Sequence, residues 1–289
     1  TVHGGKLRSG RAGAAKPASA AAPATQKTSI AAAIAKDLPQ ATLPAIDGSY
    51  ALMITGIGGT GVVTVGQLLG MAAHLEGKTV TVLDVTGLAQ KNGAVMSFLR
   101  FGNPGEPLYS PRIGLAAADA VLGCDVLVTA GREALARMAP GRTRVVANLS
   151  ATPTADFTRN PDWKFPLGEM EASIIAAIGE PSAAAFVDAT RLATALLGDA
   201  IATNLFMLGF AWQRGLIPVS AEAIERAIEL NQVAIESNRQ AFAWGRVAAV
   251  DLDRVEKAAA PVSSIALVRK PARPSLDELV AHRAEFLTG

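Results

Sequence analysis

Tyr50–Gly61, with the sequence YALMITGIGGTG, is the stretch that decides the fold. A short apolar run is followed at once by a glycine-rich turn, and then by a helical pattern that continues to Leu75. This order predicts a buried strand, a tight turn and a helix, with backbone amides at the helix start that can hold an anion such as phosphate. The candidate binding residues of the turn are Gly56, Gly58, Gly59, Thr60 and Gly61.

Asp84 extends this glycine motif. It ends a second predicted strand, Thr79–Leu83, at roughly the twenty-residue distance expected of a ribose-binding acid in dinucleotide-binding folds. Gln90, Lys91 and Asn92 are further candidates, because they follow that strand at the sheet edge where open α/β folds bind ligands. An ordinary solvated turn explains these three residues as well. The motif leaves the ligand open, since NAD, FAD, an adenylate or the diphosphate of coenzyme A would all suit helix-start amides.

Strand and helix patterns alternate up to about residue 189. Further strands are predicted at Ala94–Arg100, Asp125–Thr129, Arg144–Asn148 and Ala185–Asp188, and a helix at Glu133–Met138. This alternation predicts a three-layer, Rossmann-like α/β fold with a mostly parallel sheet. Helical patterns alone follow, at Thr190–Gln213, Ala221–Leu230 and Gln232–Trp244, and predict a helical extension after the sheet.

The pattern divides the chain into segments. Residues 11–45 are rich in Ala and Pro and are predicted to be a flexible linker. Residues 46–189 form the expected Rossmann-like core and residues 190–260 its helical extension. Residues 261–289 read as a linker and the start of a truncated helical region, whose capping box begins at Ser275. We therefore expect a piece of a longer polypeptide.

Composition excludes several classes of protein. The chain has 289 residues and a net charge of +2, without the basic face that nucleic acid requires. One cysteine, Cys124, excludes an internal disulfide and an iron–sulfur cluster held by this chain alone, and fits the cytoplasm. The three histidines show no ligand spacing, so no metal site is expected. No apolar run is long enough for a membrane span.

No catalytic residues are evident. Cys124 precedes an apolar run and has no histidine near it in sequence, which favours a small core residue over a nucleophile. Gly198-Asp199 and the later Asn231 resemble a thiamine diphosphate motif, but Ala200 stands where that motif has glycine. Asp199, Thr203 and Asn204 are better explained as an inward polar cluster or as a contact on a helix surface.

Four long runs carry a family resemblance. GIGGTGVVTVGQLLGMAA and LDVTGLAQKNGAVMSFLRFG, at 56–73 and 83–102, resemble the gamma domain of 2-oxoacid:ferredoxin oxidoreductases. Together with GDAIATNLFMLGFAWQRGLIP and AIELNQVAIESNRQAFAWGR, they resemble the large, fused indolepyruvate ferredoxin oxidoreductases of bacteria. The opening TVHGGKLR is similar to the segment that follows a cysteine-rich region there, so residues 1–10 would end a cluster-bearing region.

The resemblance implies a reaction and its cofactors. A 2-oxoacid such as indolepyruvate would be decarboxylated on thiamine diphosphate with Mg²⁺, electrons would pass through [4Fe-4S] clusters to ferredoxin, and the acyl group would go to coenzyme A. The gamma domain would assist coenzyme A access and assembly beside the thiamine and iron–sulfur domains of an oligomer, with coenzyme A phosphate as its own contact. Two alternatives are a stand-alone NAD- or FAD-binding oxidoreductase and a non-catalytic assembly module.

Overall fold

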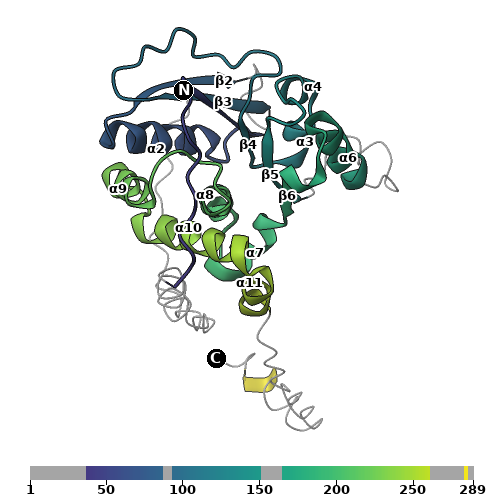
Figure 1. Cartoon of the computed structure of the whole chain (residues 1–289). Helices are drawn as coiled ribbons and strands as arrows, with labels where there is room; N and C mark the ends of the chain where they lie inside the picture. Colours follow the sequence, from purple (N-terminus) through teal and green to yellow (C-terminus); the bar gives the residue numbers. More distant parts are fainter. Residues whose placement is uncertain (1–36, 87–92, 151–164, 261–282, 286–289) are drawn as a thin grey trace, which may run out of the picture.

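A computed structural model describes residues 37–86, 93–150, 165–260 and 283–285 (Figure 1). A six-stranded sheet has the order β2-β3-β1-β4-β5-β6. The strands are β1 Tyr50–Ile57, β2 Thr79–Thr86, β3 Ala94–Gly102, β4 Ala120–Gly123, β5 Arg144–Asn148 and β6 Ala184–Val187. The pairs β1–β4, β4–β5 and β5–β6 are parallel, and only β3 runs against its two neighbours. The predicted α/β fold with a mostly parallel sheet is confirmed.

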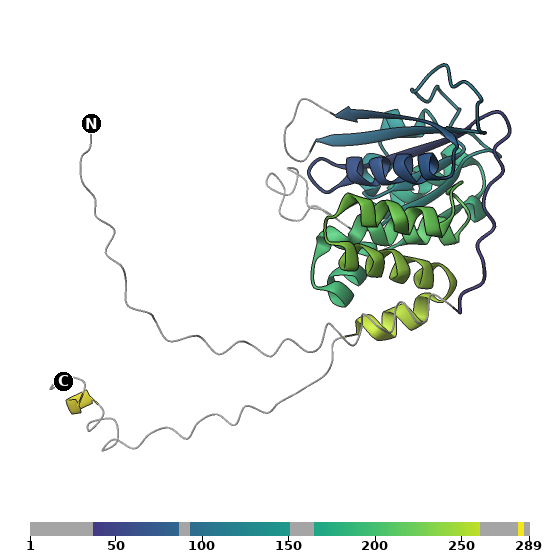
Figure 2. The same ribbon diagram turned by 90° about the vertical axis from the view of Figure 1, so that its left-hand side faces the viewer.

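Helices cover both faces of the sheet, as Figure 1 shows, and Figure 2 shows the larger group of helices beside the strands. One face carries α2 Val62–Leu75, α7 Ala189–Leu197, α8 Thr203–Gln213, α9 Ala221–Asn231, α10 Ile235–Val250 and α11 Leu252–Ala259. The other carries α3 Val126–Thr129, α4 Arg132–Leu135 and α6 Leu167–Ile178. Two short 3-10 helices, η1 Pro181–Ala183 and η2 Ala200–Ala202, lie directly before β6 and α8.

Strand β1 lies at the centre of both hydrophobic cores. Leu52 and Ile54 belong to the cluster beneath α2, α8 and α10, whereas Ala51 and Met53 belong to the cluster beneath α3 and α6. Side chains alternate across a strand, so a strand covered on both faces needs an unbroken apolar run. The sequence of β1 provides this run.

The segment Asp125–Thr129 is a helix and not the strand that its apolar sequence predicts. Asp125 is the N-cap of α3, and its carboxylate accepts a hydrogen bond of 3.0 Å from the Val128 amide. The strand, β4, lies immediately upstream at Ala120–Gly123. A short continuous apolar run does not by itself distinguish a strand from a helix, so the sequence pattern assigned this segment wrongly.

The helix predicted over Thr190–Gln213 is two helices. Gly198 ends α7 in the left-handed conformation at φ +84°, and Asp199 then caps η2 by accepting from the Ile201 amide at 2.9 Å. Similarly, α10 begins at Ile235 and not at Gln232. Gln232 and Ala234 have φ values of 56° and 44°, which lie in the left-handed region and interrupt a right-handed helix.

The described part of the expected linker, residues 37–45, lies along the helical layer. Gln213 donates a hydrogen bond of 2.6 Å to the Pro39 carbonyl, and Leu38 and Ala41 pack against the larger core. The larger hydrophobic core contains residues from both the predicted Rossmann-like segment, 46–189, and its predicted helical extension, 190–260. Residues 1–36 and the predicted capping box at Ser275 lie outside the described residues. In the part that the structure covers, no helix is both long and apolar enough to cross a bilayer.

Helices α8 and α10 cross at two glycines. A methyl group at Gly209 would overlap the Phe242 carbonyl oxygen, and one at Gly245 would overlap the Phe206 carbonyl oxygen. Each helix therefore rests its backbone directly on the other. The crossing fixes how the largest buried aromatic residues, among them Trp244, Phe206 and Phe242, fit together.

We predict that Gly209→Ala lowers the free energy of unfolding by about 3 kcal/mol, because the added methyl group forces two packed backbones apart. Thermal and urea unfolding would measure the loss. Gly168→Ala in α6 is the matched control, since nothing lies within 4 Å of a methyl group there and the helix gains propensity. Equal stability of the two variants would contradict the close crossing.

Candidate functional site

The glycine turn joins the end of β1 to the start of α2, and its glycines have two physical reasons. Gly59 and Gly61 have φ values of +87° and +98°, which residues with a side chain rarely adopt. Gly56 is needed for close approach, because a methyl group there would lie 2.5 Å from the Val62 side chain. The turn therefore requires glycine whether or not it binds a ligand.

Several hydrogen bonds hold the turn, including one of 3.4 Å from the Thr60 amide to the Ile57 carbonyl. The Gly58 amide donates to the Gly93 carbonyl at 2.8 Å, and the Thr60 hydroxyl donates to the Ile57 carbonyl at 2.8 Å. From α8, the buried Asn204 donates from Nδ2 to the Thr60 carbonyl at 2.9 Å. No side chain in the described ranges caps the start of α2. The helix start thus keeps amide groups for an anion, which its dipole also favours.

A cavity of about 360 Å³ opens beside the turn, within the size range of ligand pockets. It is lined by the turn, the ends of β4 and β5, the start of α7, the 3-10 helix η2 and the start of α8. The described lining residues are Ile57, Gly59, Thr60, Cys124, Asp125, Asn148, Ser150, Thr190, Ala200, Ile201, Thr203 and Asn204. From β1 the chain crosses to β2 on one side, and from β4 it proceeds to β5 and β6 on the other. The cavity thus lies at the switch point where open α/β folds bind ligands.

The cavity carries polar side chains on a lining that is otherwise apolar, and none of its described residues is a cation. Asn148 at the end of β5 donates to the Cys124 carbonyl at 3.0 Å and to the Thr190 hydroxyl at 2.9 Å, and accepts from the Ala189 amide. Burial raises the pKa of the Asp125 carboxyl, although hydrogen bonds from backbone amides of α3 oppose the effect. Hydroxyl, amide and carboxyl groups of this kind suit a neutral, hydroxylated ligand group better than a phosphate.

The structure separates Asp84 from this cavity. In a dinucleotide-binding fold the ribose-binding acid follows the strand beside the first one, but here β3 lies between β1 and β2. Asp84 is exposed on β2, near Gly66 of α2, and no described residue that lines the cavity comes from β2. Of the predicted site residues, Gly59 and Thr60 line the cavity, and Gly56, Gly58 and Gly61 complete the turn. Gln90, Lys91 and Asn92 lie outside the described residues.

The sequence profile of one family, described as pyruvate ferredoxin/flavodoxin oxidoreductase, matches residues 51–248. The chain belongs to this family. It is 30% identical over 207 residues to the indolepyruvate oxidoreductase subunit IorB of Thermococcus kodakarensis, covering 70% of this chain and 97% of that subunit. The IorB subunit of Pyrococcus horikoshii is 30% identical over 206 residues, with the same coverage.

A solved structure shares the fold. The match to the 2-oxoglutarate:ferredoxin oxidoreductase from Magnetococcus marinus covers 70% of this chain and 31% of that chain. Its TM-score is 0.53 and its sequence identity is 16%. At that identity the likeness shows the fold alone. Within the described residues of this family member, no group of three or more His, Cys, Asp or Glu side chains could hold a metal ion.

Several cavity residues of this oxidoreductase-family domain escaped the sequence analysis. Asp125, Asn148 and Thr190 were not predicted as binding residues, although each stands within two or three residues of a strand end. The available signal was a polar residue directly after an apolar run. For Asp125 this signal is hidden, because the sequence pattern predicts a strand at Asp125–Thr129, where the structure has α3 and its N-cap.

We predict that Asn204→Ala frees the glycine turn. The Thr60 carbonyl loses its donor, so hydrogen exchange at the amides of Gly58–Gly61 should become faster and the free energy of unfolding should fall by about 1 kcal/mol. Asn238→Ala is the control, because Asn238 makes the same type of bond to the Val233 carbonyl in an exposed position. Unchanged exchange in the Asn204 variant would contradict the role of Asn204.

Cys124 should be inert in the folded protein. It is buried, and burial together with the neighbouring Asp125 raises its pKa to about 12. At pH 8 the folded thiol therefore holds almost no reactive thiolate, whereas the unfolded thiol titrates in its ordinary range. Iodoacetamide should label it slowly until urea unfolds the chain. Rapid labelling at pH 8 without urea would contradict this interpretation.

Proposed function

We propose that this chain is the gamma-type component of an indolepyruvate-type 2-oxoacid:ferredoxin oxidoreductase. Its membership in the oxidoreductase family and its likeness along 97% of two IorB subunits support the proposal. The chain would work in the cytoplasm, with thiamine-binding and iron–sulfur domains of the same enzyme and with ferredoxin as partners. Its substrate class would be arylpyruvates.

The thiamine and electron-transfer chemistry is proposed to lie elsewhere in the enzyme. Thiamine diphosphate would supply the decarboxylation, but the polar residues of the described part include no metal-binding group for its Mg²⁺. The Gly198-Asp199 segment, which resembled a thiamine motif, is the end of α7 and the cap of η2. Asp199 uses its carboxylate on the Ile201 amide, so local structure explains it without a cofactor.

This chain's own role, we infer, is to position coenzyme A. The observation that carries this inference is the uncapped start of α2 beside a cavity that carries hydroxyl and amide side chains at the switch point of the sheet. Within Gly58–Gly61, the amides of Gly58 and Thr60 already donate to the Gly93 and Ile57 carbonyls. The amides of Gly59 and Gly61, with those at the start of α2, would therefore hold a phosphate of coenzyme A, and the cavity would take a hydroxyl-bearing part of the molecule. Lys91 is proposed as a nearby cation. An oriented thiol reaches the acyl group more effectively than one arriving by free diffusion.

The assembly function is a second candidate with its own observation. Ile201 lines the cavity, yet its side chain is 70% exposed. In this second proposal the Ile201 side chain would contact another domain of the enzyme. A nicotinamide-binding function has less support, because Asp84 is not on the strand next to β1.

A matched pair of substitutions at Gly59 tests the proposed anion site. Asn and Asp both tolerate the left-handed conformation, and nothing lies within 4 Å of a side chain added at Gly59. The two variants therefore differ in charge but hardly in shape. In the assembled enzyme, Gly59→Asp should raise the Michaelis constant for coenzyme A about tenfold over Gly59→Asn, because a carboxylate would repel the phosphate.

The Michaelis constant for the 2-oxoacid is the internal control and should be the same in both variants. If the two variants have equal constants for coenzyme A, the turn does not hold its phosphate and the positioning role is wrong. Either variant could instead reduce the amount of assembled complex while the complex that does form keeps a normal Michaelis constant for coenzyme A. This result would support the assembly function.

A further inference from the structure

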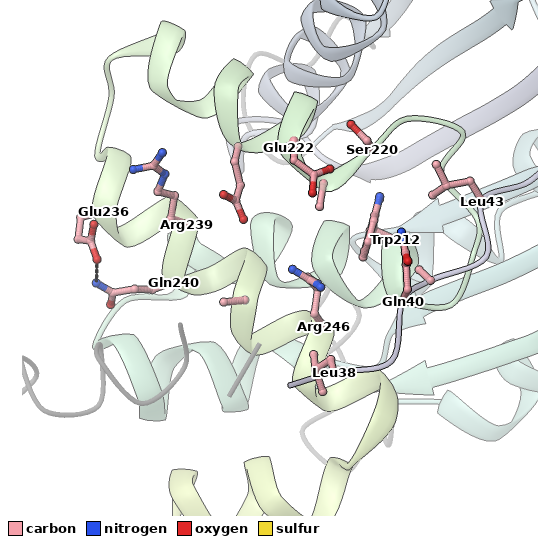
Figure 3. Close-up of a pocket in the computed structure, with 14 residues that line it drawn as sticks. Leu38, Gln40, Leu43, Trp212, Ser220, Glu222, Glu236, Arg239, Gln240 and Arg246 are labelled. Atoms are coloured by element: carbon pink, nitrogen blue, oxygen red, sulfur yellow. Dashed lines mark hydrogen bonds between the residues drawn. The ribbon is translucent and has the colours of Figure 1, made fainter. Parts of the chain in front are cut away.

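A second and larger hollow lies at the other end of α8 from the glycine turn. It is a groove of about 770 Å³ between α9 and α10, closed at one end by Trp212 of α8 and by the segment 38–43 (Figure 3). No residue of this groove belongs to the cavity beside the glycine turn. The proposed coenzyme A site therefore does not explain it.

Arg246 is held rigidly in this groove. Its Nε donates to the Gln213 side chain at 3.2 Å, and its guanidinium carbon lies 4.7 Å from the ring centre of Trp212 and 5.9 Å from that of Phe242. Among the described residues, none accepts a hydrogen bond from its two terminal nitrogens. A fixed guanidinium edge that presents free N–H groups is suited to a carboxylate, which it can bind through two parallel hydrogen bonds.

Two carboxylates lie on α9, on the far side of the groove from Arg246. Glu222 and Glu225 line the groove, and their negative charges act on Arg246. In the described structure neither carboxylate forms an ion pair with Arg246. Glu229, on the same helix, behaves differently, because it pairs with both Arg226 and Arg239. The groove thus keeps a cation and two anions apart with space between them. Figure 3 shows the Arg246 and Glu222 side chains reaching into this space.

The remaining wall is mixed. Its polar part consists of Gln40, Ser220, Glu236, Arg239 and Gln240. Its apolar part consists of Leu38, Ala41 and Leu43 from the N-terminal segment, with Ala221 and Ala243 from the two helices. A ligand that matches Arg246, the two carboxylates of α9 and this apolar part carries a carboxylate, a cationic group and an apolar body. The volume lies within the range of small-molecule sites, which favours one compact ligand over a protein segment.

We propose that this groove binds a free α-amino acid with a large apolar side chain. Its carboxylate would pair with Arg246, its ammonium group with Glu222 and Glu225, and its side chain would lie against Leu38 and Leu43. A 2-oxoacid differs from the amino acid by an oxo group in place of the ammonium, so it would satisfy Arg246 only. If the proposed function also holds, the site would sense the amino acid that corresponds to the enzyme's substrate.

Calorimetric titration of the full chain with L-phenylalanine and L-tryptophan tests the binding without using catalysis. We expect a dissociation constant below about 1 mM for at least one of them. Phenylpyruvate, N-acetyl-L-phenylalanine and L-phenylalanine amide each lack one charged group and should bind about tenfold more weakly. Because binding alone is measured, a failure of the proposed enzymatic function would leave this result intact.

Variants assign the binding to the groove. Arg246→Met and the double variant Glu222→Gln/Glu225→Gln should each weaken binding about tenfold. The double variant leaves the stacking of Arg246 undisturbed, so it remains informative if Arg246→Met fails to fold. Arg214→Met is the matched control, since Arg214 also stacks on an aromatic ring, Phe210 at 5.9 Å, but does not line the groove. No binding of either amino acid, or equal binding of the blocked forms, would overturn the proposal.

Discussion

The antiparallel strand β3, inserted between β1 and β2, is the constraint on which the rest of the structure depends. All eight residues of β1 pair with β3, whereas only Leu52–Thr55 pair with β4. Because β3 begins beside the end of β1, the Gly93 carbonyl can accept the hydrogen bond of the Gly58 amide and fix the glycine turn. The same strand moves β2, and Asp84 with it, one position away from β1. The structure therefore has the glycine turn of a dinucleotide-binding fold, but Asp84 does not lie on the strand beside β1.

Sequence patterns identified some elements, such as β1, α2 and β3, but missed others, such as β4 and α6, and did not predict the order of the strands. The order of apolar run, glycines and helical period was enough for β1 and α2, because each element has its own periodicity. Strand order is different, since it depends on pairing between distant segments, and nothing in the sequence placed β3 between β1 and β2. The cavity residues Asp125, Asn148 and Thr190 come together only through the parallel pairing of β4 with β5 and the docking of α7. The Arg246 groove likewise depends on the packing of α9 and α10.

The electrostatics of the cavity divide the proposed ligand into two parts. The start of α2 offers backbone amides and the equivalent of roughly half a positive charge, which favours a phosphate. The cavity itself contributes the Asp125 carboxyl, whose burial raises its pKa, and uncharged groups such as Asn148 and Thr190. A phosphate inside the cavity would face a carboxylate without a described cation. A phosphate at the turn, with a hydroxylated group in the cavity, avoids this repulsion and uses both surfaces.

Helix α8 links the two hollows physically. Its first residues, Thr203 and Asn204, line the cavity beside the turn, and Trp212 near its end lines the Arg246 groove. The crossing at Gly209 and Gly245 leaves no room for α8 to slide along α10, because each backbone already touches the other. Helices α8 and α10 therefore form one packed unit. Arg246 of α10 lines the groove and Asn204 of α8 holds the Thr60 carbonyl, so this unit contacts both hollows. The packing that stabilises the helical layer thereby also fixes the position of the two hollows relative to each other.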